Sequence, residues 1–417
     1  MARGGATEQA AKTPFREVFA VAEFRALWIA QLLSVVGDQL ARVALTVLVY
    51  DRTRSALLAS ITFVVSIVPT FFGGVTLAWL ADRYPRRRVM ITCDIARCAL
   101  VLVMTLPGLS LTSLVVLLFV VTLVGAPFSA ARAAIYPDVL TGDRYVMGTA
   151  VTLTTYQFAQ VLGFAAGGTV VAFFGTRTSL VIDAATFAGS AIIVWAWVRP
   201  RAAPAKAGAG RDRPRLAAIV VGARLVLARP ALLWPLLFGL LAAFYAAPEG
   251  VAAPLAHDVG GGAAAVGVIL AANALGQCCG AIMLSRFAAP PTRLRVMGPL
   301  AVAACGVLVL FFARPDLIGC LLILVASGLC ASYQLAANAA FVQAAPQQQR
   351  SQAFGLAQGA LSLSQGTAMI VAGAAAQHHA PARVIAVFGA VGAVVAMAVA
   401  AGWAHDRRRA ASGRQQR

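Results

Sequence analysis

The stretch RPRAAPAKAGAGRDRPRLAAIVVGARLVLARP, residues 199–230, is the longest polar interruption in a chain of 417 residues. Its first half is rich in Pro, Gly, Ala and Arg, which is typical of a flexible linker. Its second half places Arg215, Arg224 and Arg229 around an apolar face, so it is either a short helix on the membrane surface or a solvated linker. The stretch divides the apolar segments six and six, which predicts a protein built from two halves.

The composition places both halves in a membrane. Hydrophobic residues make up 60% of the chain and charged residues 12%, a balance that a soluble fold of this length could not cover with polar surface. Cutting the chain at charge clusters and at Gly and Pro turns leaves about twelve apolar segments, most of which could cross roughly 30 Å of hydrocarbon as a helix. The expected spans are 24–50, 56–81, 89–107, 111–134, 149–174, 179–198, 231–255, 264–285, 297–313, 317–343, 354–377 and 382–404.

The basic residues set the expected orientation. Most of the 34 Lys and Arg residues fall in the N-terminal region, in alternate loops, in the central linker and in the tail, which the positive-inside rule places in the cytoplasm. The six tryptophans fall near the same ends of the spans, where amphipathic rings favour the interface. We therefore expect a multi-pass protein of the cytoplasmic (inner) membrane with both termini inside. Its expected parts are a tail at 1–23 without a signal peptide, a six-helix half at 24–198, a basic linker at 199–230, a six-helix half at 231–404 and a basic tail at 405–417.

The distribution of charged residues, cysteines and histidines disfavours several classes of protein. The formal net charge of +19 does not predict a nucleic-acid partner, because the basic residues lie in short loops rather than on one face. The seven cysteines lie in apolar spans without a C-x-x-C pattern, and no histidines have metal-ligand spacing, so no metal or other cofactor is expected. Paired catalytic carboxylates, a nucleophile with its base and a phosphate loop are also missing from the sequence, so we do not expect an enzyme.

Two loops suggest that the halves are related. ADRYPRRRVM, residues 81–90, follows the second span, and LSRFAAPPTRLRVM, residues 284–297, follows the eighth with a four-residue insertion. Parallel repeats of six spans are a known transporter layout.

The first of these loops, read as AWLADRYPRR over residues 78–87, resembles the loop that marks the major facilitator superfamily, Gly-x-Leu-Ala-Asp-Arg-x-Gly-Arg-Arg. Ala78 and Pro85 replace the two glycines. The likeness extends over the whole chain and implies an all-α polytopic membrane protein with twelve transmembrane helices in two six-helix halves. It also implies a cytoplasmic latch, carried by Asp82 and Arg86, between the second and eleventh helices in the outward-facing state. The matched residues are Asp82, Arg83, Arg86 and Arg87.

Other stretches are similar to the drug and macrolide efflux branch of this superfamily, which includes enterobactin-exporter-like proteins. These stretches are GDQLARVAL at 37–45, CDIAR at 93–97, AARAAIYPDVL at 130–140 and IDAATF at 182–187. YQFAQVLGFAAGG, residues 156–168, is similar to the antiporter motif, with Gly163, Gly167 and Gly168 in place and Phe164 where proline is common. Glycines four residues apart also serve ordinary close packing of helices. The pattern as a whole favours export.

Opposite charges lie one turn apart inside the first span, at Asp38 and Arg42. An ionised Asp or Arg at the centre of a membrane helix costs about 2.5 to 3.5 kcal/mol on insertion scales, so such residues normally face the interior of the bundle. A spacing of four puts both on one helical face, and we expect them to pair. Either Asp38 carries a proton whose binding is linked to the direction of the cavity, or the pair is a permanently ionised brace.

The remaining charges inside spans have less defined roles. Asp94 and Arg97 repeat the pair at a spacing of three, and we expect them to brace the cytoplasmic gate, to which Asp138 also belongs. Glu249 is expected either to bind a cationic substrate or share the proton, or to be solvated near the outer surface. Asp183 is expected to be structural.

The resemblance implies that the first and fourth helices of each half line a central cavity. Carried onto this chain, they offer an apolar and aromatic cavity with a few polar groups, which suits an amphipathic or lipophilic compound better than a sugar. Polar residues of neighbouring spans either add hydrogen bonds to a ligand or contact other helices. The expected cavity residues are Asp38, Arg42, Phe244, Tyr245, Glu249, Tyr333, Gln334 and Asn338, with Gln157, Gln160, Asn273, Gln277, Gln358 and Gln365 as the additional polar groups.

We therefore expect a secondary active transporter that exports a small drug-like compound or secondary metabolite in exchange for protons, by alternating access. The proton gradient is its expected energy source, and its expected partners are the substrate, protons and the lipid bilayer, with the chain acting as a monomer. Proton-coupled or facilitative uptake of a metabolite and export of a siderophore are the alternatives. A channel would not require a latch.

Overall fold

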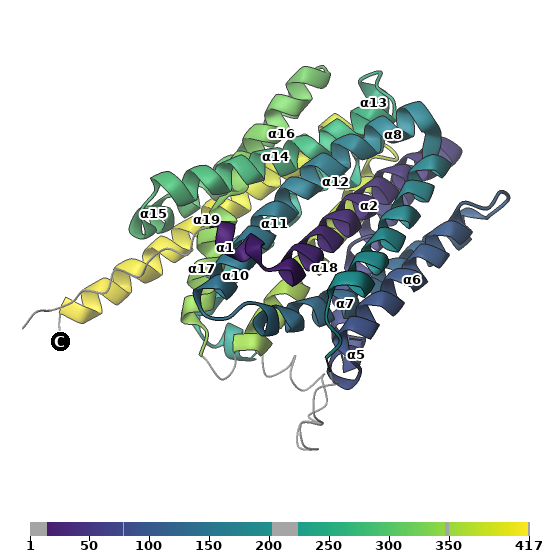
Figure 1. The fold of residues 1–417 in the computed structure, drawn as a ribbon. Helices are drawn as coiled ribbons and strands as arrows, with labels where there is room; N and C mark the ends of the chain where they lie inside the picture. Colours follow the sequence, from purple (N-terminus) through teal and green to yellow (C-terminus); the bar gives the residue numbers. More distant parts are fainter. Residues whose placement is uncertain (1–14, 78, 202–223, 347–349, 416–417) are drawn as a thin grey trace, which may run out of the picture.

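The computed structural model describes residues 15–77, 79–201, 224–346 and 350–415 (Figure 1). Outside these residues lie Ala78, most of the expected linker at 199–230 and parts of both expected tails. The regular elements of the described chain are all helices, which confirms the predicted all-α class.

The first half of the described chain contains eight helices. They are α1 (Phe15–Ala20), α2 (Ala22–Thr53), α3 (Ala56–Val65), α4 (Val68–Thr76), α5 (Trp79–Arg83), α6 (Arg86–Met104), α7 (Leu111–Val139) and α8 (Asp143–Trp197). The second half contains α10 (Pro230–Leu240), α11 (Ala242–Tyr245), α12 (Ala247–Gly250), α13 (Ala252–Asp258), α14 (Ala263–Phe287), α15 (Pro290–Gly306), the 3₁₀ helix η1 (Val307–Ala313), α16 (Leu317–Ala331), α17 (Tyr333–Ala344), α18 (Arg350–Ala375) and α19 (Pro381–Gln415).

Nine stretches of the described chain are long and apolar enough to cross a membrane. One of them, α8, contains two expected spans, because Gly175 interrupts it with a φ of 79° that glycine adopts without strain. Two more expected spans form α6 and α18, which are not among the nine. In α6 the reason is its charge, since Asp94 and Arg97 follow three arginines at its start. Length and hydropathy alone therefore do not establish the expected count of twelve.

The seventh expected span, 231–255, is divided into the short helices α10 to α13. Pro248 and Pro254 lie within this region. Proline lacks the backbone N–H that continues an α-helix, and its ring clashes with the preceding turn, so it bends or breaks the helix.

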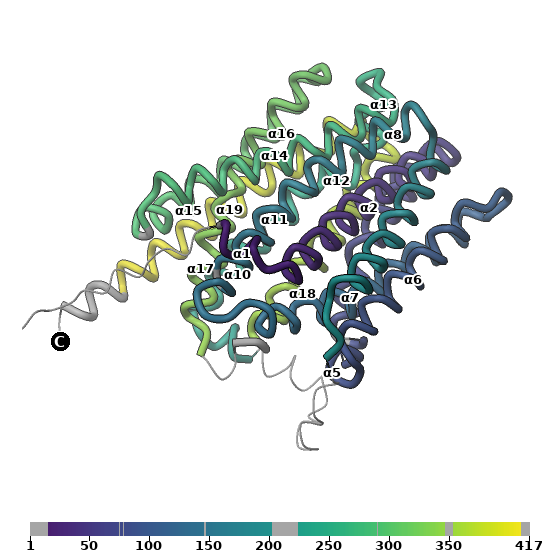
Figure 2. Tube along the Cα trace, viewed as in Figure 1, coloured from purple at the N-terminus to yellow at the C-terminus, as the bar shows by residue number. Residues whose placement is uncertain are grey.

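The helices run between two ends of the bundle. We call "linker end" the one that carries the α5–α6 turn and the starts of α8 and α10, and "far end" the one that carries the α2–α3 turn, Gly175 and the α18–α19 turn. Figure 2 shows the purple-to-blue first half beside the green-to-yellow second half, with α19 extending away from the bundle.

The two halves are joined near the far end by direct backbone packing. A Cβ atom added to Gly168 of α8 would lie 2.7 Å from the Cα of Gly267 in α14, so these helices touch without intervening side chains. The Ser60 hydroxyl donates to the Gly250 carbonyl at 2.7 Å, and the Gln377 amide donates to the Ser55 hydroxyl.

We expect Gly267→Ala to force the far end open, because its new methyl group would overlap the backbone of α8. Cysteines introduced at positions 55 and 377 report the closed far end by forming a disulfide. Gly267→Ala should lower the yield of this cross-link several-fold, whereas the control Gly74→Ala, where a Cβ meets no atom within 4 Å, should not. Equal cross-linking in both variants would show that the glycine contact does not hold the far end closed.

Candidate functional site

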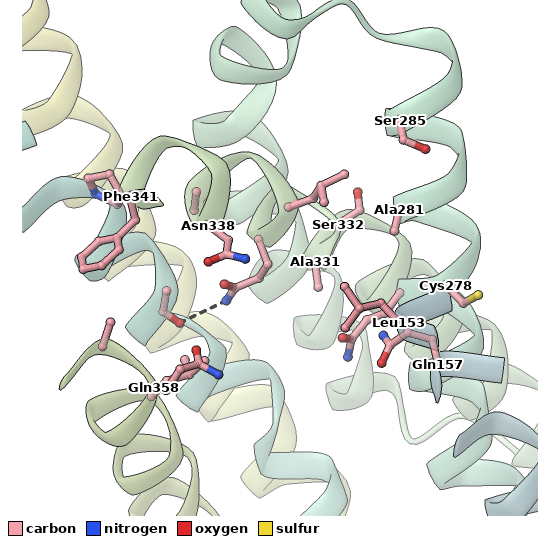
Figure 3. Close-up of a pocket in the computed structure, with 18 of the residues that line it drawn as sticks. Leu153, Gln157, Cys278, Ala281, Ser285, Ala331, Ser332, Asn338, Phe341 and Gln358 are labelled. Carbon is pink, nitrogen blue, oxygen red and sulfur yellow. Dashed lines mark hydrogen bonds between the residues drawn. The ribbon is translucent and has the colours of Figure 1, made fainter. Parts of the chain in front are cut away.

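A cavity of about 620 Å³ lies between the two halves, toward the linker end (Figure 3). It is bordered by the N-terminal part of α8, by α10, by the C-terminal half of α14, by the end of α16, by α17 and by the first turns of α18. Its lining residues are Leu153, Thr154, Tyr156, Gln157, Pro235, Leu236, Gly239, Gln277, Cys278, Ala281, Ile282, Ser285, Ala331, Ser332, Gln334, Leu335, Ala337, Asn338, Phe341, Phe354, Ala357, Gln358 and Leu361.

The polar part of this lining consists mainly of amides. Gln157, Gln277, Gln358 and Asn338 make no hydrogen bond to another described residue, and Gln334 is the fifth amide. None of the described lining residues carries a formal charge. An amide both donates and accepts hydrogen bonds, so the cavity can bind polar groups of an uncharged, mostly apolar molecule.

The side chain of Gln334 is fixed by hydrogen bonds to α10 and α11. Its amide donates to the Gly239 carbonyl at 3.1 Å and to the Tyr245 hydroxyl at 2.8 Å. Tyr333 packs edge-on against Tyr245 and donates to the Phe238 carbonyl at 2.9 Å. The predicted cavity residues Gln157, Gln334 and Asn338 thus line the cavity, whereas Tyr245 and Tyr333 are buried behind it.

Phe244, the remaining predicted aromatic residue of the cavity, packs toward α19. A Cβ atom at Gly392 would lie 2.6 Å from the Phe244 Cβ, so the two helices touch there. Sequence reasoning did not single out Ser285 or the apolar lining residues of α18. Whether the ends of α14 and α18 line the cavity depends on how the two halves are tilted. The pattern of apolar residues along the sequence does not reveal this tilt.

A second cavity, of about 160 Å³, lies inside the first half and is strongly polar. It is lined by Asp38 and Arg42 of α2, Arg97 of α6, Arg132 of α7 and Asp183 of α8, among other residues. Arg132 was not among the expected site residues, yet it lies inside α7 and lines this cavity. An arginine within the apolar stretch AARAAIYPDVL could have indicated this position.

Asp38 forms its ion pair with Arg97, and not, as expected, with Arg42 in the described chain. Arg42 instead donates to the Ser66 carbonyl at 3.1 Å, with its guanidinium near the rings of Phe63 and Phe164. The chain bends between α3 and α4 at Ser66, so this carbonyl is turned out of the helical hydrogen-bond pattern.

Arg97 and Asp94 also differ from the expected arrangement. Arg97 donates to the Ser34 hydroxyl at 3.2 Å as well as to Asp38, and Asp94 accepts from the Ser190 hydroxyl at 2.6 Å. Arg97 therefore joins α6 to α2 at the second cavity, and Asp94 joins α6 to α8.

At the linker end, the predicted gate arginines hold the first half together. Arg86 forms an ion pair with Asp138 at 2.9 Å and donates to the Ala134 carbonyl at 2.8 Å. Arg87 donates to the carbonyls of Val194 and Trp195 near the end of α8. These contacts lie within the first half. A latch to α18 through Asp82 and Arg86 stays a prediction, as does a gating role for Arg83, whose guanidinium lies 5.9 Å from the Trp79 ring centroid.

Glu249 lies between the halves. It accepts a hydrogen bond from the Asn273 amide at 3.2 Å, and its neighbour Gly250 accepts one from the Ser60 hydroxyl of the first half at 2.7 Å. It is half-buried, so the structure places it within the bundle.

The three glycines of the predicted antiporter motif face two different helices. A Cβ atom at Gly163 would lie 2.8 Å from the Gln39 Cβ, and one at Gly167 would lie 3.2 Å from the Leu40 Cα, both in α2. Gly168 faces α14 of the other half. These glycines therefore allow α8 to pack closely against both helices.

The sequence matches the family model described as "Major Facilitator Superfamily" over residues 27–249 and 249–417. It is 27% identical over 269 residues to the enterobactin exporter EntS of Shigella boydii serotype 4 (strain Sb227), and the match covers 64% of each chain. The enterobactin exporter EntS of Escherichia coli O1:K1 / APEC matches with the same identity and coverage. The chain thus spans less than two thirds of the length of these relatives.

Solved transporters share the fold. A bacterial homolog of the human lysosomal transporter Spinster, in an inward-facing and occupied conformation, superposes with a TM-score of 0.69 at 15% identity, covering 95% of this chain and 97% of that chain. A POT family transporter in complex with 5-aminolevulinic acid superposes with a TM-score of 0.72 at 12% identity, covering 90% and 95%. The described helices therefore have the arrangement of a membrane transporter.

We expect Arg97→Gln to destabilise the protein by about 1 to 3 kcal/mol, between the values for exposed and buried ion pairs, because Asp38 loses its partner. Asp38→Asn combined with Arg97→Gln should recover part of this loss, since no carboxylate is then left unpaired. Thermal unfolding of the detergent-solubilised single and double variants measures the coupling. Strictly additive effects would mean that the pair contributes nothing.

Proposed function

Because this chain belongs to the Major Facilitator Superfamily of membrane transporters, we propose that it exports a small, uncharged amphipathic molecule in exchange for protons. Secondary transport by alternating access moves a substrate through a central site that opens to one side of the membrane at a time. The protein would work as a monomer in the lipid bilayer, without a cofactor or a nucleic-acid partner.

The observation that carries this proposal is the cavity of about 620 Å³ with its unpartnered amides. A cationic substrate would favour a carboxylate in the lining, and an anionic one an arginine, but the described lining residues offer neither. Leu153, Phe341 and Phe354 supply apolar surface around the amides. A drug-like compound or a secondary metabolite fits this chemistry.

The proposed direction of transport is outward. The cavity lies toward the linker end, whereas Gly168 and Gly267 pack together toward the far end. With the linker end in the cytoplasm, as the distribution of basic residues predicts, this conformation would load its substrate from inside the cell. The names of the relatives as exporters support the same direction.

The relatives favour siderophore export as the second candidate, because both are named enterobactin exporters. Uptake of a metabolite is the remaining alternative, and a transport assay in sealed vesicles of known orientation separates it from export.

Proton coupling is proposed to use the charged groups of the first half and their neighbour across the interface. Asp38 of α2 and Arg97 of α6 form the ion pair, Arg42 follows Asp38 by one turn on α2, and Glu249 precedes Gly250, the second-half residue that contacts Ser60. A carboxyl group that changes its partner when the halves move can bind a proton in one conformation and release it in the other.

We expect proteoliposomes containing the protein to transport chloramphenicol, a neutral amphipathic compound, in response to a pH gradient, and not ethidium, a permanent cation. Enterobactin in the same assay tests the second candidate. Asn338→Leu removes one hydrogen-bonding amide and should lower the apparent affinity about tenfold, the equivalent of roughly 1.4 kcal/mol. The control Gln343→Leu removes an exposed amide that lies outside the described lining. Ethidium transport without transport of either neutral probe would contradict an uncharged substrate.

We expect Asp38→Asn to abolish transport driven by a pH gradient, because an amide cannot release the proton. Binding of the transported compound should remain, since Asp38 is not a lining residue of the main cavity. Transport at several pH values and equilibrium binding measure the two effects separately. Gradient-driven transport with the wild-type pH dependence would instead make Asp38 and Arg97 a structural brace.

A further inference from the structure

Three carboxyl groups lie around Arg97 inside the first half. Asp38 of α2 forms its ion pair, Asp183 of α8 lines the same cavity, and Asp94 precedes Arg97 by three residues on α6. Asp38 is bound to Arg97 directly, and Asp94 has a hydrogen bond from Ser190 at 2.6 Å. Asp183 is the carboxyl group of the three without such a contact among the described residues.

Asp183 is enclosed by the packing of α8 against α2. It is 1% exposed, lines the second cavity, and neither of its carboxyl oxygens has a hydrogen-bond partner in the described chain. The nearby Thr186 hydroxyl donates to the backbone carbonyl of Asp183 at 2.7 Å. A Cβ atom at Gly37 would overlap the Asp183 carboxyl, so α2 leaves no space for a polar side chain there. A buried carboxylate without partners is so unfavourable that the group takes up a proton instead.

Arg97 and Asp183 line the same cavity. Its guanidinium is 3.9 Å from the ring centroid of Phe187, which is four residues after Asp183 on α8 and therefore on the same face. Gly125 of α7 lies against the guanidinium, since a Cβ atom there would be in ordinary contact with the Arg97 Cζ at 3.5 Å. The same arginine can thus serve carboxyl groups on both α2 and α8.

We propose that Asp183 holds an exchangeable proton in this conformation, and that Arg97 is a counter-ion which Asp38 and Asp183 use alternately. When Arg97 pairs with Asp38, Asp183 is the neutral acid. When Arg97 turns to Asp183, the Asp183 proton leaves and Asp38 binds one. The protein binds the same number of protons in both arrangements, and the proton moves from the α8 side of the cavity to the α2 side.

The cavity of about 160 Å³ gives this exchange a route, since such a volume has room for several water molecules. The proton site on Asp183 does not depend on the proposed function. Only its link to transport rests on the proposed proton coupling. The charged and titratable groups that line this cavity with Asp183 are Asp38 and Arg42 from α2, Arg97 from α6, Arg132 from α7 and Tyr156 from α8, and Asp94 and Cys98 are the neighbours of Arg97 along α6.

Infrared spectroscopy of the full-length protein in lipid detects a protonated carboxyl through its C=O stretch, whose shift in D2O reports exchange with solvent. We expect this band in the wild type near neutral pH and its loss in Asp183→Asn. It should persist in Asp94→Asn and in the exposed control Asp51→Asn. It should also be lost in Asp38→Asn, because Arg97 is then free to pair with Asp183. Asp183→Ser, which is smaller than the native residue, replaces Asp183→Asn if that variant does not fold.

A wild type without the band, or a band that survives removal of the Asp183 carboxyl, overturns the proton site. A band that persists in Asp38→Asn overturns the shared counter-ion. Transport by the wild type under an imposed pH gradient is measured separately. If the band belongs to Asp183 but transport does not respond to the gradient, then proton-coupled transport fails while the proton site stands.

Discussion

The cost of holding arginine side chains in an apolar interior governs the arrangement of the first half. A buried charge is tolerated only when it is paired and hydrogen-bonded, and removing one partner of a buried pair is strongly destabilising. Arg97, on α6, meets this requirement with groups from two other helices, Asp38 and Ser34 on α2 and the ring of Phe187 on α8. The relative positions of these helices are therefore constrained by one guanidinium that none of them could satisfy alone.

The two halves meet by contacts of a different kind. The backbones of α8 and α14 pack directly against each other at Gly168 and Gly267, without ion pairs or large interlocking side chains. Such a contact can separate without leaving a charge exposed to lipid, unlike the network around Arg97. The first half is thus held together by ion pairs and hydrogen bonds, whereas the two halves contact each other mainly through close packing of their backbones. Two halves that move as rigid bodies need strong contacts within each half and contacts between the halves that can separate.

Residue patterns were sufficient for the class of fold, whereas the ion pair of Arg86 with Asp138 at the linker end was not predicted from them. They were insufficient for the partner of Asp38. Spacing along one helix allows a pair with Arg42, but a neighbouring helix offers Arg97, and only tertiary packing decides between them. Tyr245 was misplaced for a related reason, because the broken seventh span does not keep one continuous face toward the cavity.

The main cavity takes its lining from α8 on one side and from α10, α14, α17 and α18 on the other, so most of it belongs to the second half. The polar cluster around Arg97 lies entirely in the first half. The lining of the main cavity and the buried charges are thereby encoded in largely separate parts of the sequence. Substitutions in α10, α14, α17 and α18 can change the shape and polarity of this cavity without altering the residues around Arg97.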